Sequence, residues 1–153
     1  MFLLISSFVV TGYRASKKFS LRINFLKQYL QFAAYIETKV RYSYENVYEL
    51  IKNYRGESEF KKFLTKFNEN VENNVCFEEA WNLSIYSLPS TYGLKKEDLE
   101  ALESFSKNFG KSDMKGQLDY CLLLKELIKS SLSTAKEEKE KKGKLSFVLW
   151  SMS

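Results

Sequence analysis

Apolar residues recur every three to four positions along most of this 153-residue chain, which is the period of an α-helix with one buried face. The longest such stripe covers residues 19–40 and consists of Phe19, Ile23, Leu26, Leu30, Ala33, Ile36 and Val40. No glycine or proline interrupts residues 13–55, so we predict one long first helix that runs to about Tyr42. The apolar pattern continues past a kink near Ser43, and we expect Gly56 to end it as a C-terminal glycine.

Four further helical patterns follow along the chain. Residues 57–71 carry a largely aromatic stripe that predicts core packing rather than a ligand box, and Asn73 and Asn74 then form a turn. Shorter helices are predicted at 77–88, before Pro89, and at 95–109. The last helix has a buried stripe of Cys121, Leu124, Ile128, Leu132 and Ala135, and it becomes charged all round afterwards. The prediction is an all-α bundle of about five to six helices, with a long N-terminal and a long C-terminal helix and apolar residues at both chain ends.

The two apolar ends have basic residues on their inner sides. These basic residues are Arg14, Lys17, Lys18 and Arg22 near the first end, and Lys141, Lys142 and Lys144 near the second. We predict a membrane-anchor segment at 1–18, a helical cytoplasmic domain at 19–144, and at 145–153 an apolar segment that starts a candidate second anchor. A full span needs about 20 apolar residues, so the first segment is a clipped or tilted span or an interfacial anchor. The alternative is a buried N-terminal helix segment; a signal peptide would carry its charges before the apolar run.

Composition argues against several kinds of chemistry. The chain has no histidine, which removes the common general base and histidine-based zinc sites. It has no phosphate-binding loop, dinucleotide fingerprint or nucleophile elbow. Acidic residues such as Glu97 and Asp98 alternate with lysines, which predicts a solvated face rather than a catalytic pair. We therefore expect no enzyme activity, no cofactor, no metal and no small-molecule substrate.

The two cysteines, Cys76 and Cys121, each lie among apolar residues of a helical pattern. We predict that both are reduced and buried, as is common inside cells, rather than joined in a disulfide.

The net charge of +5 leaves two classes of anionic partner open. Because the basic residues concentrate near the chain ends, we favour a membrane surface and expect no nucleic acid. The alternative is a soluble basic helical module that binds nucleic acid. In that case Tyr42, Tyr44 and Tyr48, beside Arg41, would stack on bases. We favour these tyrosines as the flank of a helix.

The segment between the last two helices carries several helix-end signals. Gly110 is predicted to close one helix, Ser112 to cap the next, and Asp113 to lie in its first turn, where the helix dipole favours an acid. Gln117 follows on the surface. Two interpretations stay open for these residues: a purely structural helix corner, or a contact site for a partner protein.

Three sets of residues match a known family. They are Phe109-Gly110 with Ser112-Asp113 and Gln117; Glu79-Ala80-Trp81; and Ile36-Glu37-Thr38-Lys39-Val40. In this order and spacing, the whole chain resembles stage III sporulation protein AB of spore-forming Firmicutes. Members of that family usually have longer apolar segments at both ends than this chain shows.

The resemblance implies a fold and a cellular role. The fold would be a helical domain similar to the cytoplasmic domains of the F-type platform protein of type II secretion systems. The role would be that of a scaffold in a channel-like complex between mother cell and forespore. The expected partners are a secretion-type ATPase of the same operon and ring-forming membrane proteins. The expected location is the outer forespore membrane, with the main domain on the mother-cell side.

Overall fold

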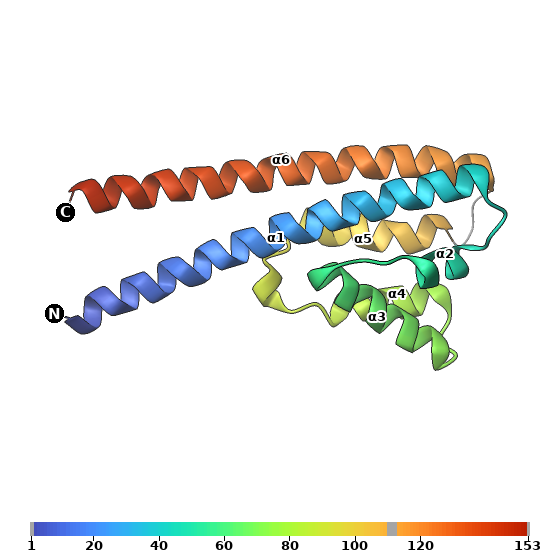
Figure 1. The fold of residues 1–153 in the computed structure, drawn as a ribbon, viewed down its shortest axis with the longest axis horizontal. Coiled ribbons are helices and arrows are strands. Elements are labelled where there is room, and N and C mark those ends of the chain that lie inside the picture. The colour runs from blue at the N-terminus through green and yellow to red at the C-terminus, as the bar shows by residue number, and fades with distance from the viewer. Residues whose placement is uncertain (1, 110–112, 153) are drawn as a thin grey trace.

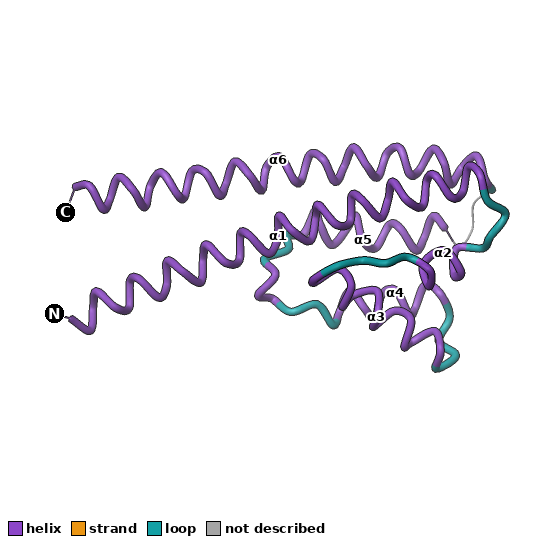
Figure 2. Tube along the Cα trace, in the orientation of Figure 1, coloured by secondary structure: helices purple, strands orange, loops and turns teal. Residues whose placement is uncertain are grey.

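A computed structural model describes the backbone of residues 2–109 and 113–152, and the side chains of residues 17–109 and 113–145. This part of the chain consists of helices and the loops between them (Figure 2). The elements are α1 (Phe2–Tyr42), α2 (Val47–Asn53), α3 (Ser58–Glu72), α4 (Phe77–Tyr86), the short 3₁₀ helix η1 (Ser90–Tyr92), α5 (Lys96–Phe109) and α6 (Met114–Met152). The prediction of an all-α bundle with a long first and a long last helix is confirmed.

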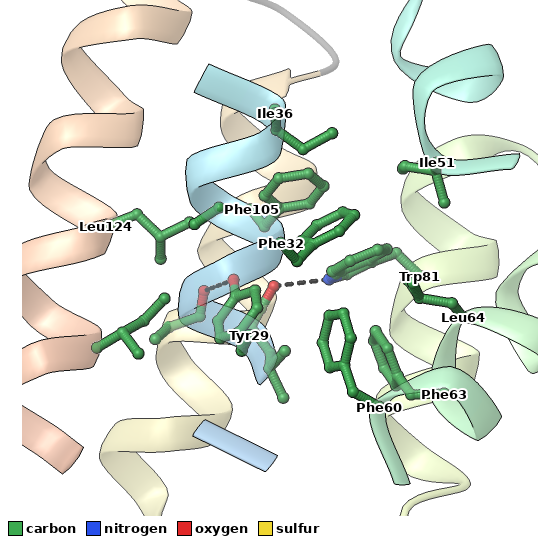
Figure 3. Packing of buried hydrophobic residues seen from close by; sticks show 14 of the residues in the cluster. Tyr29, Phe32, Ile36, Ile51, Phe60, Phe63, Leu64, Trp81, Phe105 and Leu124 are labelled. Carbon is green, nitrogen blue, oxygen red and sulfur yellow. Dashed lines mark hydrogen bonds between the residues drawn. The ribbon is translucent and has the colours of Figure 1, made fainter. Parts of the chain in front are cut away.

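The two long helices run antiparallel, and α1 lies between α6 on one side and α3 and α4 on the other, while α5 lies behind α1 in Figure 3 and packs against both α4 and α6 (Figures 1 and 3). We call residues 19–135 the head; this range leaves out the far ends of the two long helices. The amino end of α1 and the carboxyl end of α6 project from the head at the same end of the molecule (Figure 1). Each long helix continues without a break across its predicted segment boundary, at residue 18 in α1 and at residue 144 in α6.

Helix α1 is buried on more than one face. Its predicted stripe is only part of what is buried, because Phe25, Tyr29 and Phe32 are also inaccessible to solvent. The ring of Phe32 lies 5.3 Å from that of Phe60 in α3 and 5.5 Å from that of Phe105 in α5, measured between centroids. A helix that packs between two layers needs apolar residues on both sides, so a single stripe underestimates its core.

Two buried polar groups tie α1 and α4 to the middle of α5 (Figure 3). The indole Nε1 of Trp81 donates to the carbonyl oxygen of Leu102 at 2.7 Å, and the hydroxyl of Tyr29 donates to that of Ala101 at 3.0 Å. Both side chains are fully buried. Each bond satisfies a donor whose burial would otherwise cost about 1–3 kcal/mol, so the pair fixes how α5 sits against the core.

The chain reverses after α1 differently from the prediction. Instead of a kink, residues 43–46 break the helix, and the side chain of Asn46 caps α2 by accepting from the backbone N–H of Glu49 at 3.0 Å. Helix α2 ends at Asn53, and Tyr54 after it is extended, so the prediction that Gly56 is a C-terminal glycine was wrong. Asn46 favours a new helix start because its side chain satisfies a free N–H of the first turn, and apolar periodicity does not register such a restart.

The loop between η1 and α5 requires a glycine where it passes Lys18 of α1. Gly93, after η1, has a φ of 69°, and a Cβ there would lie 2.7 Å from Cγ and 3.0 Å from the carbonyl oxygen of Lys18. The absence of a side chain lets the loop before α5 lie directly against α1.

Candidate functional site

Four charged side chains meet where the two long helices leave the head. Arg22 comes from α1, Lys95 and Asp98 from the start of α5, and Glu138 from α6; we call these four residues the junction. Nε of Arg22 donates to Oδ2 of Asp98 at 2.7 Å, and Nη2 donates to Oδ1 at 3.2 Å. Only 3% of Arg22 and 1% of Asp98 is exposed. This forked geometry makes a strong pair, because both guanidinium donors meet both carboxylate oxygens.

Asp98 also serves its own helix. Its Oδ2 accepts from the backbone N–H of Lys95 at 2.9 Å, which satisfies a donor at the start of α5. The carboxylate lies in the first turn, where the helix dipole favours negative charge. The prediction that Asp98 belongs to a solvated face was therefore wrong. Its place as the third residue of a helix was the one local signal for this role.

Glu138 closes the network from the other long helix. It accepts from Nη1 of Arg22 at 3.5 Å and forms an ion pair with Nζ of Lys95. The hydrogen bond from Lys95 holds the pKa of Glu138 below its usual value, with a smaller contribution from the charge of Arg22. The junction thus contains two positive and two negative charges and links α1, α5 and α6.

One of the basic residues that we expected beside a membrane differs from the others in its burial. Arg22 is buried in the junction, because α5 presents a carboxylate to it, so its charge is paired inside the fold and is not exposed to solvent. The remaining ones with described side chains, namely Lys17, Lys18, Lys141, Lys142 and Lys144, are exposed. Nζ of Lys142 lies 4.8 Å from the centre of the Phe19 ring, which links the two long helices beyond the junction. The side chain of Arg14 is outside the described residues.

The corner between α5 and α6 lies at the opposite end of the head. Gly110 and Ser112 are outside the described residues. Asp113 directly precedes α6, and its Oδ1 accepts from the backbone N–H of Gly116 at 2.8 Å. Asp113 therefore caps α6, one position before the first turn that we predicted for it. Nε2 of Gln117 donates to the last carbonyl of α5, that of Phe109, at 3.5 Å. These contacts favour the structural interpretation of the corner, while the partner-contact interpretation stays a prediction.

An open groove of about 500 Å³ lies beside this corner. It is lined from five helices and the loop after α1, with Val40, Tyr44, Val47, Tyr48, Phe77, Phe109, Met114 and Gln117 among its walls. Tyr44 is fully exposed, whereas the ring of Tyr48 packs edge-on against Phe77 at 5.2 Å. The tyrosines predicted as a helix flank are thus divided between the core edge and the solvent.

The two cysteines have different surroundings. Both are free thiols, as predicted, but Cys76 is exposed, so its predicted burial was wrong. Cys76 directly precedes α4 and has an extended backbone, so it lies outside the helix whose apolar side is buried. Cys121 is buried against α1, and burial raises the pKa of its thiol to about 12.

Two further features of the described residues concern metal binding and membrane crossing. The described residues contain no group of three or more acidic, histidine or cysteine side chains that could hold a metal ion. Among the same residues, no helix has a stretch that is both long and apolar enough to cross a bilayer.

The segments that carry the family resemblance lie in the contacts between helices. Trp81 fills the centre of the core, and Glu37 pairs with Lys125 of α6, whose hydrogen bond holds the pKa of Glu37 below its usual value. Comparisons with curated proteins and with solved structures found no match. The family model described as stage III sporulation protein AB matches residues 1–153, which is the whole chain. The chain therefore belongs to the stage III sporulation protein AB family, a family of sporulation proteins.

Proposed function

We propose that this chain is a non-enzymatic, membrane-associated scaffold of a secretion-like channel between mother cell and forespore. The observation that carries the proposal is the common direction of the chain ends: α1 and α6 both project from the head at one end of the molecule (Figure 1). Segments 1–18 and 145–153 would therefore reach the same surface together. Family membership supplies the sporulation context.

Exposed lysines support contact with an anionic membrane. Lys17 and Lys18 on α1 and Lys141, Lys142 and Lys144 on α6 lie on the projecting ends of the helices. Near an anionic leaflet each such lysine contributes about 1 kcal/mol of attraction. By the positive-inside rule the predicted domain 19–144 would then lie on the mother-cell side of the outer forespore membrane.

The far end of the head would carry the protein contacts. There the corner and its groove present Tyr44 and the half-exposed Met114 to solvent. A secretion-type ATPase and ring-forming membrane proteins would bind such surfaces, and the chain would couple them by contact without chemistry of its own. The densely packed aromatic core suits this role, since close-packed interiors transmit displacement rather than absorb it.

Deletion and complementation in a spore-forming host test the proposal. We expect loss of the chain to stop sporulation after engulfment, and the complementing protein to sediment with membranes. Replacing Lys141, Lys142 and Lys144 with glutamine should lower the membrane-bound fraction. The matched control replaces three exposed lysines of the head, Lys61, Lys62 and Lys66, and should leave it unchanged. A protein that stays out of the membrane fraction and whose loss leaves spore yield intact would refute the proposal.

Binding to duplex nucleic acid tests the alternative function. A basic module of that kind would bind with an affinity that falls steeply as salt rises, because it displaces counterions. We expect no binding at physiological salt. Tight, steeply salt-dependent binding would reverse the ranking of the two functions.

A further inference from the structure

The inward-facing stripe of α6 changes character at the junction. Leu132 and Ala135 are buried against the rest of the bundle, and the next residues at helical spacing are Glu138 and Lys142. Both of these touch α1 through charges: Glu138 contacts Arg22, and Lys142 lies over the Phe19 ring. The buried stripe of α6 is thus apolar along the head, where the Glu37–Lys125 ion pair flanks it, and its positions beyond the head are polar.

The two halves of the junction differ in their exposure to water. Arg22 and Asp98 are almost completely buried, whereas the side chains of Lys95 and Glu138 are 47% and 29% exposed. If Glu138 moves into water, Arg22 keeps its forked pair with Asp98, and no buried charge loses its partner. Loss of Asp98 would instead remove the forked pair and leave the buried Arg22 with the single, longer contact to Glu138 at 3.5 Å. Separation of α6 from the junction is therefore inexpensive, and separation of α1 is not.

We infer that the junction is a releasable latch, at which residues 136–152 of α6 form an arm that Glu138 holds toward α1. The fixed half, Arg22 with Asp98, anchors α1 to the head. The detachable half, Glu138 with Lys95, sets how far the two helix ends spread. The ends of α1 and α6 already diverge beyond this point (Figure 1). Opening the latch would move the carboxyl end of the chain relative to its amino end while the head keeps its packing.

The movement is large enough to measure. At 1.5 Å per residue the arm is roughly 25 Å long, so a bend of about 10° near Ala135 displaces its tip by about 4 Å. Screening gives a second way to open the latch: at about 1 M salt the Debye length falls to about 3 Å, which weakens the exposed Lys95–Glu138 pair and spares the buried one.

Spin labels on the two helix ends test the latch. Cysteines replace Lys17 and Lys144, which are exposed, and Cys76→Ser removes the exposed native thiol while Cys121 stays buried. Pulsed dipolar spectroscopy then compares the parent chain with Glu138→Gln and with a matched control, Glu140→Gln, whose side chain is exposed on the same arm. Far-ultraviolet circular dichroism checks that each variant keeps its helices.

We expect Glu138→Gln to lengthen or broaden the distance distribution by about 2 Å, because residue 144 lies about 14 Å along the arm from Ala135 and a bend of about 10° there displaces it by that amount. High salt should do the same to the parent chain and little to Glu138→Gln, and Glu140→Gln should resemble the parent. A distribution that stays the same in Glu138→Gln and at high salt would overturn the inference. An equal shift in Glu140→Gln would also overturn it, because the effect would then be one of net charge. The outcome is independent of membrane binding, so it separates the latch from the proposed function.

Discussion

Removal of the Asp98 carboxylate tests the buried ion pair in terms of stability. In Asp98→Ala, Arg22 stays buried, and its nearest remaining carboxylate is that of Glu138, at 3.5 Å from Nη1. Breaking a buried pair by removing one partner costs about 3–5 kcal/mol, because the other charge is left desolvated. For a chain of this size, each kcal/mol lowers the melting temperature by about 2–4 °C. We therefore expect the melting temperature of Asp98→Ala to lie about 6–20 °C below that of the parent chain.

Thermal and urea unfolding, followed by circular dichroism, measure this loss. The matched control is Glu97→Ala, which removes the exposed acid next to Asp98 and should change stability by about 0.5 kcal/mol or less. A second variant replaces both partners with apolar side chains, Arg22→Met with Asp98→Leu, and should recover most of the loss. The reasoning fails if Asp98→Ala unfolds within about 1 kcal/mol of the parent chain, or if the double variant is no more stable than the single one.

Four further predictions concern the core, a loop, a helix cap and the thiols. Trp81→Phe should destabilise the chain by about 1–3 kcal/mol in urea unfolding, since it loses buried volume and leaves a carbonyl without its indole donor. Gly93→Ala combines a left-handed φ with a clash against α1, and we expect a loss of about 1–3 kcal/mol by the same measurement. Asp113→Ala should cost about 0.5–2 kcal/mol through the lost cap, with partner assembly unaffected if the corner is only structural. Because burial raises the pKa of the Cys121 thiol to about 12, this group stays protonated at neutral and mildly alkaline pH. Iodoacetamide, which reacts with the thiolate, should therefore modify Cys76 in the folded chain and reach Cys121 only after unfolding, as mass spectrometry would record.

The helices other than α2 could be predicted from sequence because each has a stripe of its own. The stripe of α6, from Cys121 to Ala135, is buried as expected. In α1 the periodicity identified one stripe and missed Phe25, Tyr29 and Phe32, since a helix between two layers has a second buried side. Periodicity measures how a helix is divided between apolar and polar faces, and it cannot tell how many neighbours cover that helix.

The junction was harder to predict for a different reason. Arg22 and Asp98 are 76 positions apart, and each looks like a surface residue within its own helix. Arg22 follows three other basic residues, and Asp98 stands among lysines and glutamates. Only the packing of α1 against the start of α5 brings them together, and that arrangement depends on Gly93 and the loop before α5. Charged residues that pair across the fold leave no periodic signal in the sequence.

The position of α1 between two layers also bears on how the chain folds during its synthesis. Helix α1 leaves the ribosome first and α6 last, with roughly ninety residues between Val40 and Ala135. At about 5–20 residues per second, the face of α1 that α6 covers waits for about 5–20 s before its partner exists. Helices α3 to α5 emerge during that interval and can already cover the other face. The apolar side of α1 left open in a nascent chain is thus a surface for chaperones, and truncations before α6 should aggregate more readily than truncations after Ala135.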